Sequence, residues 1–314
     1  MTDGRTDGRL DVTVLLGGPS SEREVSLASG RAVADALRRC GHDVTESDIS
    51  PADTAALDRP GIDVVFIALH GTFGENGKVQ QLCEDRRLPY VGSGPAASEL
   101  AMDKHRSKQA FRAASVATAD WALVSADDTP KRVAELLGQV PPPCVLKPVD
   151  SGSSVGVHLA RDAAARDDVL PGLLAGHGRA LVEKFIPGRE LTVGILEDRP
   201  LPVVEIRPKQ EFFDFFAKYE DDQTEFTIGV ELPGGATEAV QAEALKIHRA
   251  FGCRDLSRVD FILAADGTAY ALEVNTIPGF TSHSLVPKSA ATVGIGFEPL
   301  CDQLVRMALR RAGR

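Results

Sequence analysis

The side chains best suited to chemistry lie in one stretch of the chain, from Arg258 to Asn275. Alternating apolar and polar residues on either side of Asp266-Gly267 predict two β-strands joined by a two-residue turn. Such a turn places Asp260 opposite Glu273 and Arg258 opposite Asn275, and all four share one face because side chains alternate along a strand. A four-residue loop keeps this arrangement, whereas a three-residue loop would divide the four residues between the faces. The opposite face is expected to enter a core through Val259, Phe261, Leu272 and Val274.

This pairing brings two carboxylates together, with Cβ atoms roughly 5 Å apart. Facing like charges are unfavourable, so a positive group is expected between Asp260 and Glu273. Arg258 can supply that charge in an ion-pair cluster. Alternatively, the two carboxylates and the amide oxygen of Asn275 can hold Mg²⁺, which prefers hard oxygen ligands. The sequence of the hairpin alone does not decide between an ion-pair cluster and a metal site.

Length and composition indicate an ordinary globular protein of more than one domain. The chain has 314 residues, which exceeds what one core normally supports, so two or three domains are expected. A net charge of −10 argues against nonspecific binding of nucleic acid, which needs a basic surface. An anionic small ligand is still compatible with this charge, because a few lysines in a cleft reverse the field locally.

The cysteines are scattered and include no Cys-x-x-Cys, so neither a disulfide framework nor a zinc site is indicated. No signal peptide and no apolar run of bilayer length is present. We therefore expect a cytoplasmic protein that does not bind a membrane. Residues 1–9 repeat Thr-Asp-Gly-Arg and are expected to form a disordered tail.

The first strand, Asp11 to Gly18, precedes a helix expected from Ser21 to about Cys40. Its glycines lack the spacing of a dinucleotide-binding fingerprint. Glu24 has two interpretations. With Ser21 it matches a capping box, and it also lies where the sheet's carboxyl edge would bind a ligand's ammonium group.

Polar loops follow the next strands as well. His70 directly follows the apolar strand Asp63 to Leu69, although a lone histidine is more often structural. A helix from about Ala97 to Ala114 carries Lys104 and Lys108 on one face, as solvated surface lysines also would. Lys147 lies on a short strand before the Gly/Ser-rich loop 150–156, which offers backbone N–H groups to phosphate.

Three later segments are further candidates. The connection from Glu183 to Glu190 suits an adenine and a ribose, or is a plain domain hinge. The aromatic run from Phe212 to Tyr219 indicates a loop that closes over a site, or a local hydrophobic cluster. After the hairpin, the Gly279 N–H is placed to meet an oxyanion, and Ser284 to begin a helix near a carboxylate.

Eleven short segments, taken in order, repeat the pattern of one known family over almost the whole chain. They are Ser21-Glu-Arg-Glu-Val-Ser-Leu27, His70-Gly71, Gly74-Glu75, Met102-Asp-Lys104, Val145-Leu-Lys-Pro148, Gly152-Ser-Ser-Val-Gly156, Ala217-Lys-Tyr219, Arg258-Val-Asp-Phe261, Leu272-Glu-Val-Asn-Thr276, Pro278-Gly279 and Ser282-His-Ser-Leu-Val-Pro287. In this order and spacing they resemble the D-alanine–D-alanine ligase family of the ATP-grasp superfamily.

The resemblance implies three α/β domains, at residues 10–100, 101–187 and 188–314, with ATP between the central and C-terminal domains. It also implies that ATP phosphorylates one D-alanine and that the amine of a second D-alanine attacks the acyl phosphate, which supplies the peptidoglycan precursor. Two Mg²⁺ ions (or Mn²⁺) would neutralise the developing charge on the phosphates. A homodimer is also implied by the family.

The resemblance assigns roles to individual residues. It implies metal ligands at Asp260, Glu273 and Asn275, and catalytic roles for Glu24, Ser153, Tyr219, Arg258 and Gly279. Substrate contacts are implied for Glu24, His70, Arg258, Gly279, Ser284 and Leu285. Contacts with ATP are implied for Lys104, Lys147, Ser153, Ser154, Glu183, Lys184, Phe185, Ile186, Glu190 and Lys218.

This chain departs from the family pattern at Asn76, Gln81, Phe213 and Phe215, which puts the properties of the closing loop in question and not the reaction. Tyr219 favours the dipeptide as product, because relatives that use D-lactate tend to lose this tyrosine. The alternatives are a ligase with D-lactate or D-serine as second substrate and a nucleotide-binding protein without turnover. The second alternative predicts a lost metal ligand or phosphate lysine, and none is missing.

Overall fold

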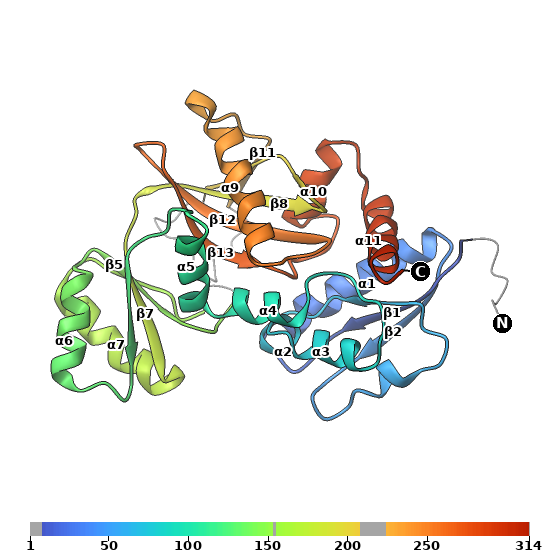
Figure 1. Ribbon diagram of the computed structural model, residues 1–314, viewed down its shortest axis with the longest axis horizontal. Coiled ribbons are helices and arrows are strands. Elements are labelled where there is room, and N and C mark those ends of the chain that lie inside the picture. Colours follow the sequence, from blue (N-terminus) through green and yellow to red (C-terminus); the bar gives the residue numbers. More distant parts are fainter. Residues whose placement is uncertain (1–7, 153–154, 208–223, 314) are drawn as a thin grey trace.

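The computed structural model describes residues 8–152, 155–207 and 224–313, and the strands among them form three sheets with helices packed against them (Figure 1). This organisation confirms the predicted α/β class. Among these residues no helix is long and apolar enough to cross a bilayer. All five cysteines carry free thiols.

The first sheet is parallel and has the strand order β2-β1-β3. The buried strand β3 is apolar throughout, as expected for a parallel strand covered on both faces. This part of the chain contains, in order, β1 (Asp11–Leu16), α1 (Arg23–Arg39), β2 (Asp43–Asp48), η1 (Ala55–Asp58), β3 (Val64–Ile67), α2 (Thr72–Glu75) and α3 (Lys78–Asp85). The carboxyl ends of β1 and β3 therefore lead side by side into the loops before Glu22 and at His70.

The second sheet is antiparallel and has the order β4-β7-β5-β6. Helices α6 and α7 cover it, at the left of Figure 1, and bury a small aliphatic core around Leu146 and Val182. Its elements are β4 (Trp121–Ser125), α6 (Pro130–Gln139), β5 (Cys144–Pro148), β6 (His158–Ala160), α7 (Ala163–His177) and β7 (Arg179–Lys184).

The third sheet has the order β11-β10-β8-β12-β13, and β9 pairs with β8. Helices α5 and α9 pack together over it, with the rings of Phe111 and Phe251 at a centroid distance of 5.2 Å. The strands are β8 (Gly188–Leu196), β9 (Arg199–Pro200), β10 (Val204–Arg207), β11 (Glu225–Ile228), β12 (Leu256–Ala264) and β13 (Ala269–Asn275); η2 (Pro233–Gly235) and α9 (Ala236–Ala250) lie between β11 and β12.

The predicted helix from Ala97 to Ala114 is in fact two helices, α4 (Pro95–Met102) and α5 (Lys104–Ala113). Asp103 leaves the helical conformation, with φ −84° and ψ 103°, and its carboxylate accepts a hydrogen bond of 2.9 Å from the Arg106 N–H. A short polar side chain at this position caps the second helix. Lys104 is consequently the first residue of α5, and Lys108 lies one turn further along the same helix.

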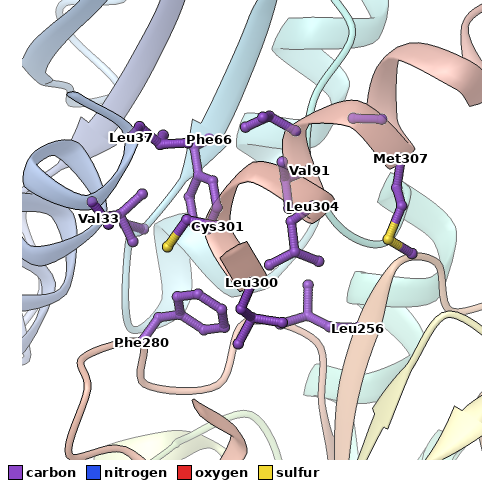
Figure 2. Packing of buried hydrophobic residues seen from close by; sticks show 14 of the residues in the cluster. Val33, Leu37, Phe66, Val91, Leu256, Phe280, Leu300, Cys301, Leu304 and Met307 are labelled. Atoms are coloured by element: carbon purple, nitrogen blue, oxygen red, sulfur yellow. The ribbon is translucent and has the colours of Figure 1, made fainter. Parts of the chain in front are cut away.

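The last two helices, α10 (Leu285–Thr292) and α11 (Phe297–Arg311), return the chain to the first sheet. Figure 2 shows the resulting core. Leu300 and Leu304 of α11 meet Val33 of α1 and Phe66 of β3, and all four side chains are almost completely buried. The first and last segments of the chain therefore share one core.

The hairpin of β12 and β13 has the predicted residue pairs at the end away from its loop, but the loop and the register between differ from the prediction. Arg258 faces Asn275 and Asp260 faces Glu273, as predicted. The loop, however, has three residues and not two, because the Ala264 N–H bonds the Thr268 carbonyl at 2.9 Å. The predicted two-residue turn at Asp266-Gly267 is therefore wrong.

A β-bulge between these two ends restores the register. Phe261 pairs with Ala271 and Asp260 with Glu273, which leaves Leu272 as an extra residue on β13. The prediction that Leu272 enters the core is wrong, because fully buried Ala271 does so and Leu272 lines a cavity instead. The bulge thus puts two consecutive side chains, Leu272 and Glu273, on the cavity side of the strand.

Candidate active site

A cavity of about 800 Å³ lies between the second and third sheets, with walls from β5 and β7 on one side and β8, β10, β12 and β13 on the other. A second cavity, of about 70 Å³, adjoins it on the side of the first sheet and includes Glu22 and His70. Five residues line both cavities and so mark their junction: Lys104, Ser151, Arg258, Glu273 and Gly279.

Asp260 is held rigidly at this junction. The Arg258 guanidinium donates to both carboxylate oxygens, from Nε to Oδ1 at 2.9 Å and from Nη2 to Oδ2 at 2.8 Å. The Thr192 hydroxyl of the neighbouring strand β8 donates to Oδ1 at 2.5 Å. All three residues are more than nine-tenths buried. Because alternate residues of β12 share a face, Arg258 and Asp260 meet in the bidentate geometry that such pairs prefer.

Glu273 stands in a different environment. Its side chain is 35% exposed, and Lys104 approaches its carboxylate at 3.9 Å. The amide oxygen of Asn275 accepts a hydrogen bond from the Ile277 N–H at 3.0 Å, which fixes the side chain where it lines the smaller cavity. The predicted ion-pair cluster is therefore present for Arg258 and Asp260, whereas Glu273 has Lys104 at a distance of 3.9 Å.

The oxygen donors at the junction fit a divalent cation. Asp260 lines the larger cavity, Asn275 the smaller and Glu273 both, so that two carboxylates and one amide oxygen lie along the two adjoining cavities. Such a set suits Mg²⁺ or Mn²⁺. Within the described parts of the chain, no group of three or more His, Cys, Asp and Glu side chains is arranged to hold a metal. The amide of Asn275 is therefore needed to complete the set.

The lysines predicted on one face of a helix are not solvated. Lys104 is 8% exposed and Lys108 is 1% exposed, so the surface interpretation is wrong for both. Lys104 donates to the Ser151 carbonyl at 2.5 Å. Lys108 and Lys147 flank the carboxylate of Glu183, Lys108 at 2.9 Å and Lys147 in close contact. Burial alone would raise the pKa of Glu183, but the two ammonium groups outweigh burial and hold that pKa well below its ordinary value.

The connection from β7 to β8 is more than a hinge, because it forms a wall of the larger cavity. Its lining residues include all five that the sequence singled out: Glu183, Lys184, Phe185, Ile186 and Glu190. The Lys184 and Phe185 N–H groups are fixed on the Asp120 and Pro143 carbonyls, at 2.8 and 3.1 Å. Leu272 of the opposite sheet lines the same cavity, so apolar side chains border it on both sides, as in sites for flat, partly apolar ligand groups.

The smaller cavity is organised by His70. Its Nε2 lies 3.2 Å from the Ser29 hydroxyl, and its Nδ1 lies 3.5 Å from a carboxylate oxygen of Glu75. Glu22 and Glu75 both line this cavity, which makes it acidic and suited to an ammonium group. Sequence reasoning missed Glu75 as a site residue, although its position in the glycine-rich loop after His70 was a signal for it.

The structure does not bring Glu24 to the site. Helix α1 begins at Arg23 with Glu22 as its N-cap residue, and no side chain caps it, so the predicted capping box is wrong. Glu24 is exposed and lines neither of these two cavities, nor a third of about 330 Å³ that Ser20, Gly71 and Gly152 line. Glu22 lies two residues closer to the carboxyl end of β1 and lines both the smaller cavity and this third one.

The remaining predicted residues fall into two groups. Gly279, Ser284 and Leu285 line the larger cavity, and Ser284 is the N-cap residue of α10, as predicted. Ser153, Ser154, Lys218 and Tyr219 lie outside the described residues, as does the aromatic run from Phe212.

Comparison with solved structures defines the class of fold. A D-alanine–D-alanine ligase from Bacillus anthracis in complex with ATP matches with a TM-score of 0.83 and 31% identity, over 97% of this chain and 99% of that one. The VanG D-Ala:D-Ser ligase from Enterococcus faecalis matches with a TM-score of 0.85 and 26% identity, over 96% of this chain and 99% of that one. The architecture is therefore the ATP-grasp fold, as predicted.

Sequence comparison is more specific. The family models for the N-terminus and the C-terminus of D-ala D-ala ligase match residues 48–93 and 110–306. A D-alanine–D-alanine ligase from Anaeromyxobacter sp. (strain K) is 44% identical over 305 residues, which is 96% of this chain and 97% of that protein. One from Geobacter sulfurreducens is 43% identical over 94% of this chain and 92% of that protein. The chain belongs to the D-alanine–D-alanine ligase family.

Proposed function

We propose that this protein is an ADP-forming ligase that joins two D-alanines at the expense of ATP, for the synthesis of peptidoglycan precursors. The observation that carries the proposal is the junction of the two cavities. A large, partly apolar cavity with buried lysines meets a small acidic one, and Asp260, Glu273 and Arg258 stand at the boundary. In this arrangement a nucleotide's terminal phosphate would lie beside the carboxylate of a small amino acid.

The reaction needs activation because a free carboxylate is a poor electrophile. The carboxylate oxygen of the first D-alanine attacks the γ-phosphorus of ATP, which releases ADP and forms an acyl phosphate. The amine of the second D-alanine then adds to the acyl carbon, and collapse of the tetrahedral intermediate expels phosphate. The chain's part is to hold the three reactants in line and to balance negative charge.

Each side chain at the junction has a task in this scheme. Lys104 and Lys147 reach the phosphates, and the wall from Glu183 to Ile186 with Glu190 holds the adenosine. Arg258, whose plane is fixed by Asp260, and the Gly279 N–H stabilise the oxyanion. Ser284 and Leu285 bound the second substrate. Lys218, Tyr219, Ser153 and Ser154 keep the roles that the family pattern gives them.

We propose that Asp260, Glu273 and Asn275 hold two Mg²⁺ or Mn²⁺ ions. When bound, these ions would neutralise the charge that develops between the β- and γ-phosphates. The ion pair with Arg258 already balances Asp260, so the exposed carboxylate of Glu273 is the one left to attract a cation.

We assign the ammonium group of the first D-alanine to Glu22 and not to Glu24. Glu22 lines the small cavity that also contains His70, whereas Glu24 is exposed. Glu22→Gln should therefore raise the KM for the first D-alanine at least about tenfold, as expected for the loss of a charge-assisted hydrogen bond. Glu24→Gln is the matched control, because it makes the same chemical change two residues away. Equal effects of the two substitutions would contradict the assignment.

The decisive assay is ATP-dependent phosphate release with D-alanine, L-alanine, and D-alanine plus D-lactate or D-serine, followed by identification of the product. We expect release with D-alanine alone and D-alanyl-D-alanine as the product. No release with D-alanine and Mg²⁺ would contradict the proposed function. The free thiols of all five cysteines suit a reducing cytoplasm, where ATP is available. Assembly as a homodimer stays a prediction.

A further inference from the structure

Three charged side chains form a compact cluster behind the wall of the larger cavity. Lys147 and Glu183 line the cavity, whereas Lys108 lies behind them and does not. Lys108 is 1% exposed, and Glu183 lies between the two lysines. With both lysines protonated, the cluster holds two positive charges and one negative charge, which leaves one positive charge in excess. Burial lowers the pKa of Lys108, and the adjacent carboxylate of Glu183 opposes that shift.

The Lys108 ammonium group has a charged, a polar and an aromatic neighbour, so it is built into the fold. It forms an ion pair of 2.9 Å with Glu183 and donates to the Thr118 hydroxyl at 2.7 Å. Its third side faces the ring of Trp121, at 5.5 Å from the centroid. Thr118 in turn donates to the carbonyl of Ala271, the residue beside the bulge of β13. Lys108 thus links the Glu183 wall to the strand that carries Glu273.

Without Lys108, the cluster would consist of Lys147 and Glu183 alone. Those two charges cancel, so Lys147 would offer little net attraction to a phosphate. If Lys147 turned towards the phosphate instead, the buried carboxylate of Glu183 would lose its counter-ion, which is strongly unfavourable. With Lys108 behind it, Glu183 keeps a counter-ion whichever way Lys147 points.

We propose that Lys108 is a positioning residue for nucleotide binding, which supplies the counter-charge for Glu183 and thereby makes the charge of Lys147 available to the phosphates of ATP. Lys108 touches neither the cavity nor the nucleotide and acts through Glu183. The inference rests on the proposed function, because it assumes that the larger cavity binds ATP. The proposed role differs from a purely structural one in one respect. Loss of the Lys108 charge should weaken binding of the phosphates and leave binding of the adenosine unchanged.

This difference gives the test. The dissociation constants of ADP and of adenosine are measured by calorimetry for the wild-type protein and for Lys108→Met, which keeps the length of the side chain and removes its charge. We expect ADP to bind about thirtyfold more weakly to the variant, which corresponds to about 2 kcal/mol, while adenosine binding changes little. An equal loss for both ligands, or no loss for ADP, would overturn the inference.

A double variant separates the charge from the packing. Lys108→Met with Glu183→Gln has one positive charge in the cluster, as the wild type does, and no buried carboxylate. The quantity compared is the preference for ADP over adenosine, that is, the ratio of their dissociation constants. We expect the double variant to regain most of the preference that Lys108→Met loses. Failure to regain this preference would overturn the inference. If Lys108→Met does not fold, the double variant and Lys108→Arg carry the test, and both should keep the wild-type preference for ADP over adenosine.

The same measurements keep the two proposals apart. A wild-type protein that binds neither ADP nor adenosine would contradict the proposed function itself, and the inference with it. A wild-type protein that binds both, with no change of preference in Lys108→Met, would contradict only the role of Lys108.

Discussion

The hydroxyl of Thr192 should matter more for activity than its size suggests. It donates to Asp260 at 2.5 Å from the neighbouring strand, and both groups are buried. Thr192→Val replaces this hydroxyl by a methyl group of almost the same shape, so the fold should tolerate the change. Asp260 would keep Arg258 but lose the contact that fixes Oδ1 from the side of β8.

The size of the effect follows from the chemistry of that hydrogen bond. A hydrogen bond to a charged group contributes about 1.5–3 kcal/mol, and burying a methyl group in place of the hydroxyl recovers part of that loss. We therefore expect the free energy of unfolding to fall by about 1–2 kcal/mol. Turnover should fall about tenfold to a hundredfold, because a small displacement of a group that acts on the phosphates costs far more in rate than in stability.

The assay compares phosphate release and urea unfolding for Thr192→Val and for Thr192→Ser, which keeps the hydroxyl and loses the methyl group. Thr192→Ser should lose stability through its small cavity and keep most of its turnover. The reasoning would be refuted if the two variants had the same turnover, or if Thr192→Ser were the less active one. Either result would mean that packing, and not the hydrogen bond to Asp260, decides the effect.

Two further predictions follow from groups near and far from the site. Glu273→Gln should lower turnover at least about a hundredfold while the free energy of unfolding changes little, because this side chain is 35% exposed and is a ligand of the proposed cation site; full activity would contradict the metal assignment. Burial lowers the pKa of His248 to about 4 in the folded state, whereas the unfolded chain takes up that proton near pH 6.5. Stability should therefore fall as the pH drops from about 6.5 to 4, by up to about 3 kcal/mol from this residue. Urea unfolding of His248→Gln at several pH values should show a shallower fall, and identical slopes would exclude this origin.

The sequence predicted the facing pair of Asp260 and Glu273 correctly, but not the route by which the strands reach it. Twelve residues separate the two carboxylates. A two-residue turn with a regular ladder uses that number, and so does a three-residue loop with one bulged residue. Periodicity cannot distinguish the two, because the bulge is fixed by distant contacts. Ala271 is held on both sides by the segment before β4, through the Ala117 carbonyl and the Thr118 hydroxyl.

The wrong capping box at Glu24 and the wrong surface alternative for the two lysines have a similar cause. A capping box is a local pattern, and the start of α1 at Arg23 is decided by how the helix packs on the first sheet. Lys104 and Lys108 have the spacing of an exposed helical face, and their burial depends on the second and third sheets meeting over α5. Residue types near the site were therefore predictable, whereas which of two neighbouring glutamates points inward was not.

The shared core of α1, β3 and α11 has a consequence for the order in which the protein folds during synthesis. The first sheet leaves the ribosome well before Leu300, Leu304 and Met307, which complete its core and follow Phe66 by more than 230 residues. Until then Val33 and Phe66 lack their partners, and exposed apolar surface of this kind is prone to aggregate or to bind chaperones. A deletion of α11 should thus damage the first sheet before it affects the two sheets that enclose the larger cavity.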